Sequence, residues 1–204
     1  MLLSPPIYAY SNTDILNLPK PAAYTSDFAG VINPEIQSQI NAISNEVEQK
    51  TSAEIAVVTV KNIEDNSIED FTVRLFEKWG IGKKGKDNGI LLLAAIDDKK
   101  VRIEVGYGLE GILPDGLTGE ILDTYVIPAF KQNDYSKGLL MGCAAIAKVI
   151  ARDANVQLTG QFIQAPTKET LQKSRPSFFR SLIKFIFFII LFFFFIRHPF
   201  LFLL

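Results

Sequence analysis

The sequence predicts an α/β domain with a small mixed sheet, followed by a transmembrane helix near the carboxyl end. Between residues 34 and 95, amphipathic helical patterns alternate with short apolar runs, as in β-α-β units. Lys100–Gly106 then alternates apolar and charged residues after a tight turn, which indicates an antiparallel hairpin partner. Residues 181–204 are almost uniformly apolar and rich in phenylalanine.

The predicted domain opens with a helix and a buried strand. Asn33 and Pro34 provide an N-cap and a first helical residue, and apolar residues then recur every three or four positions to about Gln49. Glu54–Val60 is almost wholly apolar, as expected for a strand that is covered on both faces.

A second helix and strand follow. Ser67 caps the helix, which ends at Gly80, and Gly89–Ala95 is the next buried strand. Residues 54–95 therefore form a right-handed β-α-β unit. The turn Asp97-Asp98-Lys99 returns the chain antiparallel, so the sheet is mixed.

Two helices complete the predicted domain. One runs from about Leu117 to Ile127 and is stopped by Pro128, because proline lacks the amide proton that a helix interior needs. The other begins at Asp134, a good N-cap, and extends to about Arg152.

The outer segments differ in composition from the domain. The amino end resembles the last part of a signal peptide with a cleavage site after Ala9, and an ordinary terminal segment is the alternative. We divide the chain into a leader or truncated signal peptide with an extended segment (1–26), the α/β domain (27–153), a basic linker (154–180) and a transmembrane anchor (181–204).

The anchor is predicted from an unbroken apolar run. Every residue from Phe185 to Ile196 is apolar, and Lys184 can extend its ammonium toward the headgroups. A buried core helix is the alternative, but this segment is apolar on all sides. We therefore expect a single-pass membrane protein whose span is slightly short.

Composition excludes several functional classes. The net charge is −1 and no aromatic-basic interleaving precedes residue 150, which argues against a nucleic-acid partner. The Gly-x-Gly sequence at Gly106 does not open directly into a helix, so no nucleotide cofactor is expected. The single histidine, His198, lies in the apolar tail, and the single cysteine, Cys143, lies on the apolar side of the last helix. A Ser-His-Asp triad and a Cys/His zinc site are therefore excluded from the domain.

Two loops carry the remaining chemistry. After the hairpin strand, Gly106, Gly108 and Gly111 permit close backbone approach, while Glu110 and Asp115 offer hard oxygen ligands of the kind that Ca²⁺ or Mg²⁺ prefers. For Asp115 the alternative role is a helix N-cap.

The second loop carries Asp87-Asn88-Gly89 immediately before a strand, where a simple turn is the alternative. The hairpin is expected to bring Asp87 and Glu110 to one edge of the sheet, where they form a carboxylate-lined cation site.

Several ordered motifs resemble the TPM-domain family. The resemblance covers about Tyr24–Ile150. Its marks are Asp27-Phe28-Ala29-Gly30-Val31, Trp79-Gly80-Ile81-Gly82, Gly85-Lys86-Asp87-Asn88-Gly89 before Leu91-Leu92-Leu93, Val101 through Gly111, Ile127-Pro128 and Asp134-Tyr135.

The resemblance implies a Rossmann-like α/β/α sandwich that is usually exported and often tethered by a carboxyl-terminal membrane helix. It also implies divalent-metal binding, acid phosphatase activity or thylakoid photosystem II repair in different members. Transferred by motif, the metal ligands would be Asp87, Asn88, Glu110 and Asp115, with Glu104 added if its strand ends at the same edge.

Three functions stay open at this stage. The first is a membrane-tethered, extracytoplasmic domain that binds a divalent cation, preferably Ca²⁺, and acts with other membrane proteins or complexes in assembly, repair or quality control. The second is a metal-dependent phosphatase for phosphomonoesters, whose catalytic residues the sequence does not identify. The third is a metal-free protein-interaction module.

The predicted membrane topology rests on conflicting signals. The basic linker would favour a cytoplasmic domain by the positive-inside tendency. The family resemblance implies export, to the periplasm, the cell surface or a thylakoid lumen. A signal peptide upstream of Met1 would allow export despite the basic linker. The domain would then be translocated before the transmembrane span reaches the membrane.

Overall fold

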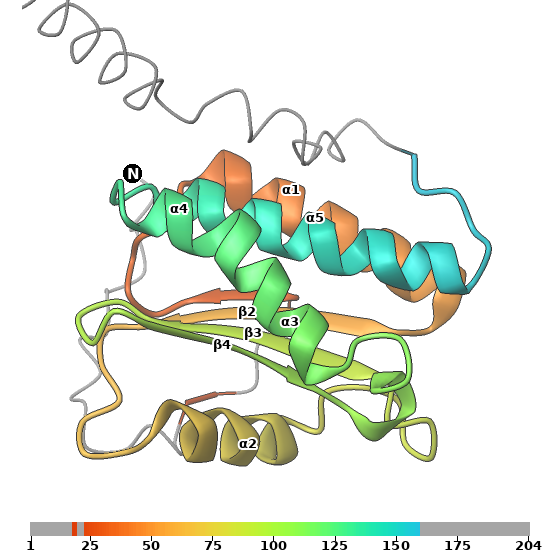
Figure 1. Cartoon of the computed structure of the whole chain (residues 1–204), viewed down its shortest axis with the longest axis horizontal. Helices are drawn as coiled ribbons and strands as arrows, with labels where there is room; N and C mark the ends of the chain where they lie inside the picture. Colours follow the sequence, from red (N-terminus) through yellow and green to blue (C-terminus); the bar gives the residue numbers. More distant parts are fainter. Residues whose placement is uncertain (1–17, 20–22, 160–204) are drawn as a thin grey trace, which may run out of the picture. The chain divides into compact units, whose positions relative to one another are not determined.

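The computed structural model describes residues 18–19 and 23–159, which form a mixed α/β fold (Figure 1). The strands are β1 (Thr25–Asp27), β2 (Glu54–Val60), β3 (Gly89–Ala95) and β4 (Lys100–Val105). The helices are α1 (Pro34–Thr51), α2 (Ile68–Trp79), α3 (Asp115–Ile121), α4 (Ile127–Phe130) and α5 (Tyr135–Asp153).

The sheet is mixed, as predicted. Its order is β1-β2-β3-β4, with β1, β2 and β3 parallel and β4 antiparallel to β3. The predicted bounds of β2 and β3 are confirmed, whereas β1 begins two residues before the expected domain start at Asp27. Strand β1 was not predicted, because a three-residue strand has too short a pattern to recognise.

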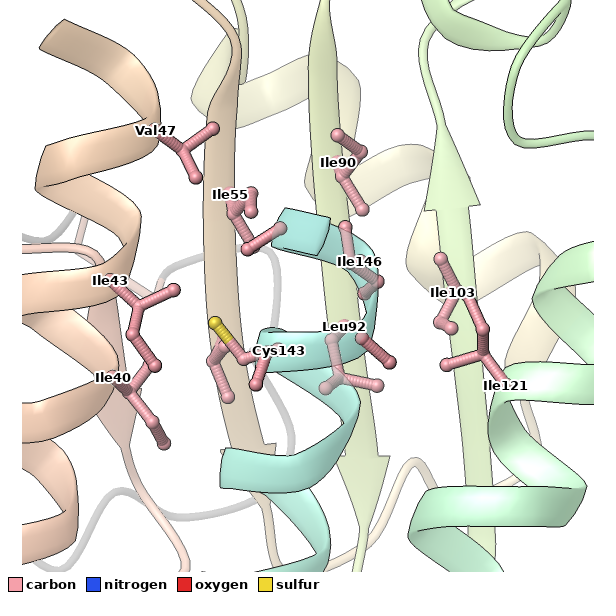
Figure 2. Packing of buried hydrophobic residues seen from close by; sticks show 14 of the residues in the cluster. Ile40, Ile43, Val47, Ile55, Ile90, Leu92, Ile103, Ile121, Cys143 and Ile146 are labelled. Carbon is pink, nitrogen blue, oxygen red and sulfur yellow. The ribbon is translucent and has the colours of Figure 1, made fainter. Parts of the chain in front are cut away.

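Alternating residues of the central strands form two apolar layers. Ile55, Val57 and Leu92 pack with α1, α3 and α5, and Figure 2 shows Ile55 and Leu92 among side chains such as Ile40, Cys143 and Ile146. Ala56, Val58, Leu91 and Leu93 point the other way, toward α2. The sheet is therefore covered by helices on both faces, with α2 alone on one of them among the labelled helices (Figure 1).

Three predicted helix starts are confirmed by their caps. The Asn33 side chain accepts a hydrogen bond from the Ile36 amide at 2.8 Å, with Pro34 as the first helical residue. Ser67 and Asp134 accept from Asp70 and Lys137 at 3.0 and 3.1 Å. These bonds satisfy amides that the first helical turn leaves without partners.

The prediction for the segment around Pro128 was wrong. The helix begins at Asp115 rather than Leu117, Pro114 occupies the N-cap position, and the chain remains helical past Pro128. A π-helical turn, Leu122–Val126, joins α3 to α4. Its wider spacing accommodates the proline, whose ring would otherwise clash with the carbonyl one turn earlier.

The predicted leader, most of the basic linker and the membrane anchor lie outside the described residues. Within residues 18–19 and 23–159, no helix is long and apolar enough to cross a membrane.

Candidate functional site at the loop edge

The two predicted loops meet at one edge of the sheet, which we call the loop edge. It lies where β2 and β3 begin and β4 ends, because β4 runs antiparallel. The Gly106 amide donates to the Gly89 carbonyl at 2.8 Å, and the Gly108 amide donates to the Asp87 carbonyl at 3.0 Å. The hairpin thus holds the backbones of the two loops against each other.

Gly106 and Gly108 are required by this backbone contact. A Cβ atom at Gly106 would lie 2.2 Å from the Asp87 carbonyl oxygen, and one at Gly108 would lie 2.0 Å from the Lys86 carbonyl oxygen. Both distances are too short for any side chain. Gly111 meets nothing within 4 Å. Gly106 and Gly108 therefore allow the two loops to pack closely. This packing explains why glycine occupies both positions, and no bound ligand is needed to explain it.

The carboxylates of the two loops point outward. Asp87, Glu110 and Asp115 are exposed, and Asp87 adopts a left-handed backbone conformation with φ 47°. In the part of the chain that the structure describes, no salt bridge involves any of these three residues. Asp115 is the first residue of α3 and not its cap. The loop edge thus carries carboxylate oxygens that are open to solvent.

Asn88 has a structural role in the same loop. Its side chain is buried, accepts a hydrogen bond from the Lys83 amide at 2.9 Å and donates to the Ser52 carbonyl at 2.9 Å. These contacts tie the 82–88 loop to the end of α1. The predicted ligand Asn88 is therefore already engaged by protein groups.

Glu104 is paired within its own strand. One of its oxygens accepts from the Arg102 guanidinium at 3.0 Å. Glu104 pairs in register with Leu91, whose side chain belongs to the α2 layer. The carboxylate consequently sits on the α2 face of β4, and the structure does not group it with Asp87 or Glu110.

A polar cluster centred on Glu48 in α1 was not predicted from the sequence. The Tyr24 hydroxyl and the Lys83 ammonium both donate to the Glu48 carboxylate, and Lys83 also lies 4.0 Å from Glu54. Burial, followed by the hydrogen bond to Glu48, raises the pKa of Tyr24 to about 12. The hydrogen bond from Lys83, followed by that from Tyr24, lowers the pKa of Glu48. The members come from three distant segments, so no local motif indicates the cluster.

A second carboxylate, Asp27, which the sequence indicated only as part of a family motif, lies at the end of β1. It accepts hydrogen bonds from the amides of Val31 and Ile32 at 3.1 and 2.8 Å and from the Thr59 hydroxyl. This carboxylate shapes the turn that leads into α1.

The available groups limit the chemistry of the domain. Among the described residues, no group of three or more His, Cys, Asp or Glu side chains is placed to hold a metal ion. A cation at the loop edge would therefore need water to complete its coordination. Burial raises the pKa of the Cys143 thiol to about 12, which leaves it without nucleophilic character at neutral pH.

Comparisons with known proteins identify one family. The profile of the TPM domain matches residues 25–149. The N-terminal domain of a protein from P. gingivalis is similar, with 35% sequence identity, a TM-score of 0.62 and coverage of 67% of this chain and 87% of that one.

Two more distant solution structures share the fold. The N-terminal domain of cg2496 from Corynebacterium glutamicum has 17% identity, a TM-score of 0.50 and coverage of 68% and 84% of the two chains. BA42 from Bizionia argentinensis has 22% identity, a TM-score of 0.51 and coverage of 62% and 90%. The search of curated protein sequences found no match.

Proposed function

This chain belongs to the TPM domain family, and from that membership we propose that it is a membrane-tethered, extracytoplasmic binding domain for a divalent cation. In this proposal the domain acts with other membrane proteins in their assembly, repair or quality control.

One observation carries the cation proposal: the backbones of the Asp87 and Gly106–Glu110 loops are locked together, while their carboxylates stay open to solvent. Two of the three lysines in the same loop are engaged elsewhere, Lys83 with Glu48 and Lys86 with the Ser52 hydroxyl, while Lys84 is exposed. Asp87 and Glu110 would therefore supply the oxygens, with Asp115 nearby in sequence. Ca²⁺ suits this arrangement better than Mg²⁺, because its coordination geometry is less strict and water can fill it.

The test is thermal unfolding of the full chain with Ca²⁺ or with chelator. At ten times its Kd a ligand of the folded state stabilises by roughly 1.4 kcal/mol, which raises the Tm by a few degrees. A variant with Asp87→Asn and Glu110→Gln should lose this shift. A variant with Asp65→Asn and Asp97→Asn is the matched control, because it removes the same charge from exposed positions that follow β2 and β3, at the opposite end of the sheet. Equal Tm values in Ca²⁺ and chelator would refute cation binding.

Phosphatase activity is less well supported than cation binding. It would require a carboxylate nucleophile or a metal-activated water, because the only histidine, His198, lies in the apolar tail and the only thiol, Cys143, is buried. Hydrolysis of a phosphomonoester that disappears when Asp87, Glu110 and Asp115 are all replaced by their amides would establish it.

A metal-free interaction module is the third candidate, and Tyr107 favours it. This side chain is 80% exposed on the turn between Gly106 and Gly108, whose contacts fix the loop. Rigid, exposed tyrosines are common at the centre of protein interfaces. This candidate would take precedence if Tyr107→Ala abolished a physiological interaction in chelator.

The extracytoplasmic location rests on the family resemblance and on the apolar sequence of residues 181–204. Protease treatment of intact cells or spheroplasts tests it. The domain should be digested without membrane disruption, and full protection until lysis would place it in the cytoplasm instead.

A further inference from the structure

A hollow of about 190 Å³ lies between α3, the π-helical turn and α5. No residue of the loop edge lines it. Its apolar lining comes from two elements, with Leu117 and Ile121 on α3 and Ala145 and Val149 on α5. The hollow therefore offers a surface for an apolar group, and this surface is distinct from the exposed carboxylates of the loop edge.

Hydrogen-bond donors that have no acceptor among the described residues surround this lining. Lys148 and Arg152 lie one helical turn apart on α5, and both are exposed. Within residues 18–19 and 23–159, neither forms a salt bridge, and no side-chain hydrogen bond to either or to the Tyr125 hydroxyl is found. Glu120 also lines the hollow but has an interaction of its own. The rim thus has a net positive charge.

The π-helical turn contributes directly to the hollow. Tyr125 belongs to this turn, and the amide of Ile127 donates to the Leu122 carbonyl five residues earlier. The extra residue in the turn changes the direction of the side chains that follow α3. π-turns inside helices are rare and frequently occur at functional sites.

We propose that this hollow binds a small, soluble organic anion. Its carboxylate or phosphate would lie between Lys148 and Arg152, and its apolar body would contact Leu117, Ile121 and Val149. The volume of about 190 Å³ is below the roughly 300–1,000 Å³ of pockets for drug-sized ligands, so the body is a single ring or a short chain. This site is independent of the proposed cation site.

The probe is 4-fluorobenzoate, and its binding to the full chain in nanodiscs of zwitterionic lipid is measured by ligand-observed ¹⁹F NMR. We expect saturable binding that is about ten-fold weaker or more in a variant with Lys148→Gln and Arg152→Gln, because two charge-assisted hydrogen bonds are lost. The matched control carries Lys131→Gln and Lys137→Gln, which remove the same charge from exposed positions outside the hollow.

Two further comparisons separate charge from shape. The neutral analogue 4-fluorobenzamide should bind about ten-fold more weakly than the benzoate if the cations recognise the anion. Val149→Phe should reduce binding of the benzoate by filling the hollow without changing charge. The proposal is overturned if the benzoate does not bind, if both double variants weaken it equally, or if the amide binds as tightly as the benzoate.

Discussion

At the scale of single residues, the Glu48 cluster makes the stability of the fold depend on pH. Glu48 receives hydrogen bonds from Lys83 and Tyr24, and the first of these is the main cause of its lowered pKa. A carboxylate whose pKa is lower in the folded state than in the unfolded state stabilises the fold above the unfolded pKa. That contribution is lost as the pH falls through the folded pKa.

We therefore predict that Glu48→Gln destabilises the domain by about 1–2 kcal/mol at neutral pH, since one charge-assisted network is lost at a partly exposed site. The difference from wild type should shrink as the pH falls below 4.5, the ordinary pKa of glutamate. Urea unfolding between pH 3 and pH 7 measures both effects.

Glu77→Gln is the control for this experiment. Glu77 is exposed on α2, and none of the side-chain hydrogen bonds or salt bridges between described residues involves it. Its replacement should change the free energy of unfolding by no more than a few tenths of a kcal/mol at any pH. A pH-independent cost for Glu48→Gln would show that the ionised network is not what stabilises this site.

At the scale of elements, the contact between the two loops depends on a glycine. A Cβ atom at position 108 would lie 2.0 Å from the Lys86 carbonyl oxygen, which belongs to the backbone and cannot move aside cheaply. We predict that Gly108→Ala costs about 1–3 kcal/mol in the free energy of unfolding, within the range of overpacked sites. Gly111→Ala, where nothing lies within 4 Å, should cost much less. Equal urea midpoints for the two variants would contradict the packing role of Gly108.

Most elements could be predicted because their signals are local. Asn33, Ser67 and Asp134 act as the caps that their positions indicated. The helix was wrongly predicted to stop at Pro128, because the π-helical turn that accommodates this proline has no sequence signature of its own.

The candidate site was predictable only in outline. The predicted hairpin placed the Asp87 and Glu110 loops at one edge of the sheet, and the structure brings these loops together there. The roles of Asn88 and Glu104 were not predictable, because tertiary contacts decide whether their side chains are free to bind a cation. Asn88 bonds to Ser52, far away in sequence, and Glu104 pairs with Arg102 on the α2 face.

At the scale of the whole molecule, the two helical layers are unequal. The connections β1-α1-β2 and β2-α2-β3 both join neighbouring parallel strands and step the same way across the sheet. Their helices nevertheless cover opposite faces. The two crossover connections must therefore have opposite handedness. Only one of them has the right-handed sense that nearly all β-α-β connections adopt. This arrangement leaves α2 to cover its face without a neighbouring helix from the described segments (Figure 1).

We predict that α2 opens at a lower free energy than α5. Helix α2 has 12 residues and buries Phe71, Leu75 and Trp79 against one face of the sheet, whereas α5 has 19 residues and packs with α1 as well as with the sheet. An element with fewer buried apolar contacts can unfold locally while the rest of the domain stays folded.

Native-state hydrogen exchange, read by mass spectrometry at low denaturant concentrations, measures this difference. Amides in α2 should exchange through an opening that costs less than global unfolding, while those of β3 and α5 should require global unfolding. As denaturant rises, the free energies of all three should converge, because global unfolding then becomes the easiest route. If the α2 amides are as protected as those of β3 without denaturant, the domain unfolds as one cooperative unit and the two layers are energetically equivalent.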